Sequence, residues 1–328
     1  MDAIRGTAGS MLWSGQGQDQ GGRQGQGRLQ WQPFGASLAV LRRLAKVTAV
    51  LVLTCASAGL ATVLAPLPAM AQAVEADLQR LDDLTRIPET FDIMRLEGLA
   101  HDQAMAADLF GDAQDPDWMR ALDLVYDIPR MNATYRDQMR LALAQDPGLV
   151  ADAGVFLGSD LGQRIIGLEL EARRTALDPM ALGAAREVFA EMARVDKERM
   201  ALIERLVLAG DLIEGNVATA LNANVAFSRA MAKGAQFGVP VDVEEILALA
   251  WAQEPEIRVA VADFLYPLLA LAYAPLTEDE LTTYVEFFES AVGQRFNAAV
   301  MQAFDPVMID LSARLGAEAG RLMSGQVL

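Results

Sequence analysis

The stretch LTEDELTTYVEFFESAVGQRFNAAVMQAF, residues 276–304, carries the clearest helical pattern in the chain. Its apolar residues recur every three or four positions, as Leu281, Tyr284 and Phe288 do, which places them on one face of an α-helix. Sustained alternation of apolar and polar residues, typical of half-buried strands, occurs in no segment of the chain. The sequence therefore predicts an all-α fold.

Helix starts are marked by capping residues. Thr277 precedes Glu280 by three positions, the spacing of a capping box in which each side chain accepts a hydrogen bond from the backbone of the other residue. Asp178 before Pro179 predicts an N-cap followed by proline at the first helical position. We expect similar starts at three other pairs: Asp115-Pro116, Asp146-Pro147 and Glu254-Pro255.

The longest periodic run extends from Pro179 to Leu208. Charged residues occupy its predicted wet side, where Arg194 and Glu198 stand one turn apart. The predicted buried side holds Val188, Met192, Val195, Ile203 and Leu206. We also expect the two tryptophans that lie in apolar surroundings, Trp118 and Trp251, to pack in the interior.

One nine-residue phrase occurs twice in the sequence. FLGSDLGQR at 156–164 and FFESAVGQR at 287–295 are 131 positions apart and share five of nine letters. In each copy an amphipathic helix ends, a serine follows as a predicted N-cap, and Gly-Gln-Arg opens the next helix. Each glycine would let another helix approach closely. The motif residues are Ser159, Gly162 and Arg164 in the first copy, and Ser290, Gly293 and Arg295 in the second.

The repeat predicts a helical bundle built from two related units, residues 72–199 and 200–328, that share one core. Each copy later reaches an Asp-Pro pair, at Asp178-Pro179 and Asp305-Pro306. A duplication of about half the mature chain explains these parallels better than chance.

Residues 276–304 resemble the core of the bacterial domain of unknown function 2059 family. The matching residues are Leu281, Phe287, Phe288, Ser290, Gly293 and Arg295, whereas Ala291 stands where that family commonly has proline. The first copy is a weaker match over 147–179. The resemblance implies an exported, mostly helical protein, and it implies no activity or catalytic residue.

A leader is predicted at residues 41–71. Arg42, Arg43 and Lys46 precede an apolar run from Val47 to Leu64, and Ala69-Met70-Ala71 has the small-x-small pattern of a cleavage site. We expect cleavage after Ala71, with an uncleaved membrane anchor as the alternative. Residues 1–40, rich in Gly and Gln, are either a disordered extension or the product of a start site assigned too far upstream.

The charge of the predicted mature chain is strongly acidic. Residues 1–71 hold six basic and two acidic groups, so the remainder has 21 basic against 42 acidic groups, a net charge of −21. Such a body repels phosphate backbones, which disfavours nucleic-acid binding. The single cysteine, Cys55, lies inside the leader, so the mature chain can form no disulfide or thiolate metal site.

The pattern predicts no catalytic, cofactor-binding or metal-binding residue. His101, the only histidine, has no nucleophile motif beside it, and one histidine excludes the common zinc sites. Asp112, Asp115 and Asp117 stand close together, but Pro116 breaks the order of an EF-hand loop. Arg164 and Arg295, near helix N-termini, could hold an anion, although pairing with neighbouring carboxylates is the simpler expectation.

The resulting hypothesis is a non-catalytic periplasmic accessory or interaction protein with an unidentified protein partner in the cell envelope. The first alternative is a carrier that holds an apolar ligand between the two units. A hydrolase that uses two carboxylates is the second alternative, and the sequence cannot nominate that pair among so many acids.

Overall fold

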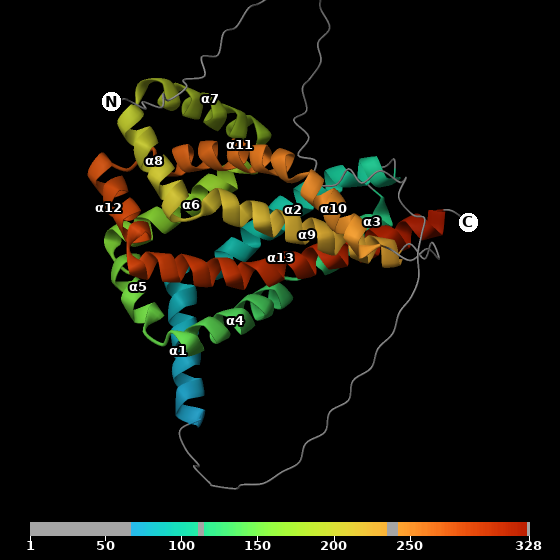
Figure 1. Ribbon diagram of the computed structural model, residues 1–328, viewed down its shortest axis with the longest axis horizontal. Coiled ribbons are helices and arrows are strands. Elements are labelled where there is room, and N and C mark those ends of the chain that lie inside the picture. The colour runs from blue at the N-terminus through green and yellow to red at the C-terminus, as the bar shows by residue number, and fades with distance from the viewer. Residues whose placement is uncertain (1–66, 111–114, 235–241, 327–328) are drawn as a thin grey trace, which may run out of the picture. The chain divides into compact units, whose positions relative to one another are not determined.

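A computed structural model describes residues 67–110, 115–234 and 242–326 (Figure 1). Within these ranges every regular element is an α-helix, which confirms the predicted all-α helical bundle. The helices are α1 (Leu67–Thr85), α2 (Ile87–Phe110), α3 (Pro116–Val125), α4 (Ile128–Gln145), α5 (Leu149–Leu157), α6 (Asp160–Ala176), α7 (Pro179–Val195), α8 (Lys197–Ala209), α9 (Leu212–Gly234), α10 (Val243–Ala252), α11 (Glu254–Tyr273), α12 (Glu278–Glu289) and α13 (Ala291–Gln326).

Several predicted helix starts are confirmed by their capping bonds. The Thr277 hydroxyl accepts a hydrogen bond from the Glu280 backbone N–H at 3.2 Å, and the Glu280 carboxylate accepts one from the Thr277 N–H at 2.9 Å. Asp178 caps α7, and Asp115 caps α3 by accepting from two backbone N–H groups. These side chains satisfy amides that have no partner inside the helix.

Two predicted helix starts are wrong, because the helix begins at a different residue in each case. Asp146 does not cap a helix: its backbone carbonyl accepts from the Leu149 N–H at 3.1 Å, so a turn precedes α5, and α5 is capped by Gly148. Helix α11 begins at Glu254 itself, because the Gln253 carbonyl already accepts the first helical bond, from Ile257 N–H.

The run from Pro179 to Leu208 is interrupted at Asp196. This residue ends α7 through its N–H, and its carboxylate accepts from the Arg199 N–H at 3.0 Å to start α8. The break changes the helix direction, so one continuous face does not exist. Met192, Ile203 and Leu206 are buried as predicted, whereas Val188 and Val195 are exposed, and Arg194 pairs with Glu191 rather than with Glu198.

One large core joins helices from both predicted units. Its buried members come from every helix except α10, and they include Phe91, Tyr135, Ile203 and Leu281. Trp118 is fully buried, as predicted. A smaller cluster packs α10 against α9 and α11 through Val217, Leu221, Ala250, Ile257 and Val261.

The longest helix, α13, runs beside α9 (Figure 1). A Cβ atom on Gly316 would lie 2.2 Å from the backbone oxygen of Phe227, so glycine is required for this close approach. Pro306 lies inside α13, and the second Asp-Pro pair therefore starts no helix, unlike the first. In the described part of the chain, no helix combines the length and apolar character needed to cross a bilayer.

Some predictions concern residues outside the described ranges. The segment 1–40, the leader up to residue 66 and Asp112 fall there. Residues 67–71, which end the predicted leader, are the first residues of α1.

Candidate functional site

The first copy of the repeated phrase forms a tight corner between α5 and α6. The hydroxyl of Ser159 accepts from the Gly162 backbone N–H at 3.0 Å and donates to the Phe156 carbonyl at 2.6 Å. One side chain thus caps the start of α6 and also bonds the Phe156 carbonyl at the end of α5, which accepts from the Ser159 backbone N–H as well.

The second copy forms the same corner between α12 and α13. Ser290 accepts from the Gly293 N–H at 3.0 Å and donates to the Phe287 carbonyl at 2.6 Å. The two phrases therefore match in their hydrogen bonds as well as in their letters.

The glycines are fixed by backbone contact. A Cβ atom on Gly162 would lie 2.2 Å from the Phe156 carbonyl oxygen, and one on Gly293 would lie 1.9 Å from that of Phe287. Both distances are far inside van der Waals contact with an atom that cannot rotate away. The predicted close approach is real, although the approaching atom belongs to the preceding helix of the same corner.

The glutamines tie each corner to a distant helix end. Gln163 donates to the carbonyl of Leu157 and, at 2.8 Å, to that of Leu84 in α1. Gln294 donates likewise to Phe288 and to Ala209, the last residue of α8. The distant acceptor in each case lies two residues before a non-glycine residue of positive φ, Arg86 (φ 55°) in one and Asp211 (φ 50°) in the other.

The two corners touch through their first residues. The rings of Phe156 and Phe287 stack with centroids 4.4 Å apart and planes inclined by 14°. The ring of Tyr284 also stacks on that of Phe156, with centroids 5.8 Å apart. In Figure 1, α5 and α12 accordingly lie at the same side of the bundle.

The two motif arginines cross between the corners. Arg164 donates to the Glu280 carboxylate in the first turn of α12 and to the Pro275 carbonyl at 2.7 Å. Arg295 reaches Asp152 in α5 at 3.1 Å and Asp146, just before that helix, at 3.2 Å. The structure thus brings all six predicted motif residues into two contacting corners, where carboxylates of the chain already occupy both guanidinium groups.

A buried polar cluster beside the corners was not foreseen from the sequence. The hydroxyls of Tyr273 and Tyr284 both donate to the same Glu169 oxygen, each at 2.7 Å. Loss of hydration raises the pKa of the Glu169 carboxyl, against the two tyrosine hydrogen bonds, which lower it. The pKa values of both tyrosines are raised as well, by burial and by the nearby carboxylate. This cluster links α6, α11 and α12 by hydrogen bonds.

A buried acid, Asp102, lies in α2 with 2% of its surface exposed. It accepts from the Tyr126 hydroxyl at 2.6 Å, and its backbone carbonyl accepts from the Trp118 indole N–H at 2.9 Å. Burial raises the pKa of Asp102 to about 7, while burial lowers the pKa of the adjacent half-buried His101. Asp102 and Tyr126 therefore form a buried hydrogen bond that links α2 to the end of α3.

The other buried acid, Asp82, pairs with Arg136 across α1 and α4. Glu169, Asp102 and Asp82 therefore bond to tyrosines or to an arginine, each on a different set of helices. The described ranges also contain no group of three His, Cys, Asp or Glu side chains placed to hold a metal ion.

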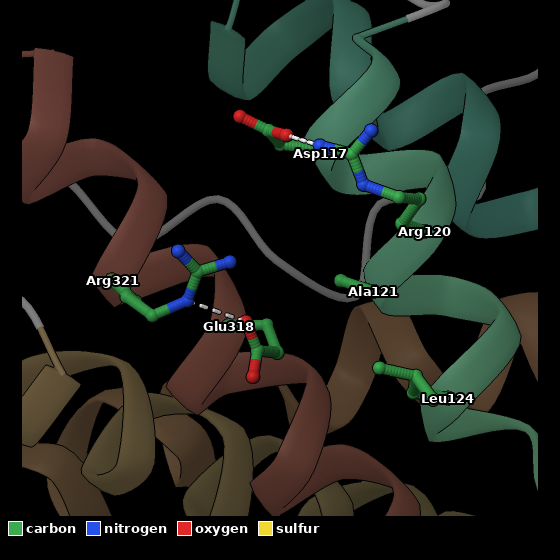
Figure 2. Close-up of a pocket in the computed structure, with 6 residues that line it drawn as sticks. All are labelled: Asp117, Arg120, Ala121, Leu124, Glu318 and Arg321. Atoms are coloured by element: carbon green, nitrogen blue, oxygen red, sulfur yellow. Dashed lines mark hydrogen bonds and ion pairs between the residues drawn. The ribbon is translucent and has the colours of Figure 1, made fainter.

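A cavity of about 360 Å³ opens between α3 and α13 (Figure 2). Two ion pairs, each within one helix, stand on its opposite walls: Asp117 with Arg120, and Glu318 with Arg321. Ala121 and Leu124 line the α3 wall between them. Its lining contains two acidic and two basic side chains, and each is paired within its own helix. These six residues therefore do not point a common set of hydrogen-bond donors at one ligand.

No family model matches the chain, and neither does any curated protein or solved structure.

Proposed function

We propose that this chain is a non-catalytic accessory protein of the cell envelope that acts through contacts with another protein. The observation that carries this proposal is that the polar residues of the repeated phrase bond to the chain itself. Its serines, glutamines and arginines bond to the chain itself at the two corners, and its glycines are packed against backbone. The most distinctive polar residues therefore serve the fold and face no ligand cavity.

The proposal includes an origin by duplication. The equal capping bonds of Ser159 and Ser290, the glutamine bonds to α1 and α8, and the positive-φ residues that follow those helices support two related units. Membership of the domain of unknown function 2059 family and export to the periplasm remain part of the proposal, and they rest on the residues of 276–304 and of the leader.

A carrier of an apolar ligand held between the units stays the alternative. The contact between the corners is filled by the stacked rings of Phe156, Phe287 and Tyr284, and by the Glu169 cluster below them. These contacts favour the accessory role.

Crosslinking in the native host tests the proposal. The full-length chain, tagged at its C-terminus, is treated in living cells with formaldehyde and recovered under denaturing conditions. We expect a periplasmic chain that begins at Gln72 and a discrete adduct with one other protein. Recovery of the uncrosslinked monomer alone would contradict the accessory role. Native mass spectrometry of the same protein, with extra mass lost on denaturation, would favour the carrier instead.

A further inference from the structure

Helix α10 presents an apolar stripe to solvent. Val243, Leu247 and Trp251 follow one another at intervals of four residues, so they lie along one side of the helix. Their exposed fractions are 41%, 41% and 65%. The expectation that Trp251 packs in the interior is wrong, because α10 buries only Ala250 against its neighbours.

This exposure is unusual for the composition of the helix. Eight of the ten residues of VEEILALAWA are apolar, yet α10 contributes nothing to the large core and packs only on the small cluster with α9 and α11. Leu249, on the opposite flank of α10, and Val259, in the second turn of α11, are exposed as well. An exposed apolar stripe along one side of a helix marks an interaction site, and tryptophan is enriched at the centres of protein interfaces.

The surroundings of the stripe are acidic. From Asp242 to Asp263 the chain holds six acids and one base, a net charge of −5. The one base, Arg258, is occupied by Glu214 and Glu254. Glu244 and Glu256 remain exposed at the first turns of α10 and α11. An apolar stripe with such a rim complements an apolar surface flanked by positive charge.

We propose that α10 and the first turns of α11 dock an amphipathic helix of another protein, with an apolar face bordered by lysine or arginine. The inference rests on the proposed accessory function and names the surface that would perform it. Charge selects this occupant, since a second copy of the chain would bring the same acidic rim against itself, and an anionic bilayer would be repelled in the same way. The indole of Trp251 also offers a face for a cationic side chain.

Calorimetric titration of the full-length chain tests the docking surface. The probe is a synthetic amphipathic peptide of leucine and lysine, and its control is the leucine–glutamate peptide with the same apolar face. We expect the lysine peptide alone to bind, with an affinity that falls as salt rises. The double variant Leu247→Ser/Trp251→Ser and the variant Glu244→Gln/Glu256→Gln should each bind roughly tenfold more weakly. Leu208→Ser, at a site 79% exposed on α8, should bind like the parent chain.

Several results would overturn the docking surface. They are absence of binding, equal binding of the glutamate peptide, and equal loss of affinity in the Leu208→Ser control. Self-association that is lost on Trp251→Ser would assign the stripe to a second copy, and binding to neutral phosphatidylcholine vesicles would assign it to a lipid surface. Circular dichroism of each variant checks that the fold is retained.

A crosslinking pair separates this proposal from the accessory function. A photoreactive residue is placed at position 251 in one full-length chain and at 208 in another, and both are irradiated in cells. An adduct at 251 only is the expected result. An adduct at 208 only would overturn the docking surface and keep the accessory function, whereas no adduct at either position, with the formaldehyde adduct also missing, would overturn both.

Discussion

Phe156 and Phe287, the first residues of the two repeated phrases, stack on each other with ring centroids 4.4 Å apart. Contact between equivalent residues is what a two-fold relation produces, as at the interface of a symmetric dimer. The crossed pairs of Arg164 with α12 and of Arg295 with α5 follow the same relation. The repeated phrase therefore lies where two similar helix corners meet, and this contact supports the proposed relation between the two halves.

Adding a methyl group to either corner glycine should destabilise the protein. Gly162→Ala and Gly293→Ala each place a Cβ within 2.2 Å of a backbone oxygen, so the helices of the corner must separate. We expect a loss of about 2 to 3 kcal/mol in the free energy of unfolding for each, measured by urea denaturation. Gly183→Ala in α7 is the matched control, because nothing lies within 4 Å of its Cβ position. That variant should be about 0.5 to 1 kcal/mol more stable than the parent, and equal effects at all three sites would contradict the packing.

Removing the corner hydroxyls should cost less and should cost equally. Ser159→Ala and Ser290→Ala each lose a cap on an N–H group and a donor to a helix-end carbonyl. We expect a loss of about 1 kcal/mol at each position in the same denaturation experiment. A large difference between the two serines would show that the corners are not equivalent.

The contribution of Asp102 to the stability of the protein should fall as pH rises from about 4 to about 7. The pKa of Asp102 is about 7 in the folded chain and ordinary, near 3.8, in the unfolded chain. Between these two pH values the folded chain holds a proton on Asp102 that the unfolded chain has lost. The free energy of unfolding that this proton contributes is therefore complete below about pH 4 and is lost by about pH 7. The raised pKa of Glu169 acts in the same direction.

Asp102→Asn isolates this effect. Its free energy of unfolding should vary less between about pH 5 and pH 8 than that of the parent chain, by on the order of a few kcal/mol. Exposed carboxylates with lowered pKa values, such as Glu75 and Glu89, oppose the trend only near their own titration, below about pH 4.5. Parallel pH profiles for the variant and the parent would refute the role of Asp102.

The Glu169 cluster should tolerate an amide but not a hydrocarbon. Glu169→Gln keeps an oxygen that can accept from both tyrosines, and we expect a change of less than about 1 kcal/mol. Glu169→Leu leaves the hydroxyls of Tyr273 and Tyr284 buried without an acceptor, at a cost of roughly 2 to 5 kcal/mol. Thermal unfolding of the pair at one pH measures the difference, and similar melting temperatures for the two variants would show that the hydrogen bonds contribute little.

Local signals predicted the fold class and the capping residues, because helix periodicity and caps are properties of short segments. The capping box of Thr277 and the serine caps need only four residues of sequence to be recognised. The break at Asp196 was missed, since the apolar period continues in phase across it. The Asp305-Pro306 pair was matched to the helix start at Asp178-Pro179, yet α13 continues through Pro306 where it packs against α9.

Long-range partners could not be read from the sequence. Glu169 stands among other charged residues on a helix, and nothing in its local sequence separates an acid that bonds buried tyrosines from a solvated one. Its acceptor role arises because Tyr273 and Tyr284 arrive from more than 100 residues away. Trp251 shows the converse. Its neighbours in sequence are apolar, which predicted burial, but α10 contacts the rest of the fold along one narrow side only and leaves Trp251 exposed.

A double-mutant cycle at Phe156 and Phe287 tests the contact between the two corners most directly. Phe156→Ala, Phe287→Ala and the double variant are unfolded with urea beside the parent chain. If the two corners meet through these rings, each single variant loses about 3 kcal/mol, and the two losses are coupled by about 1 kcal/mol. Additive losses, with a coupling energy of zero, would show that the two rings do not touch and would contradict the proposed relation between the two halves.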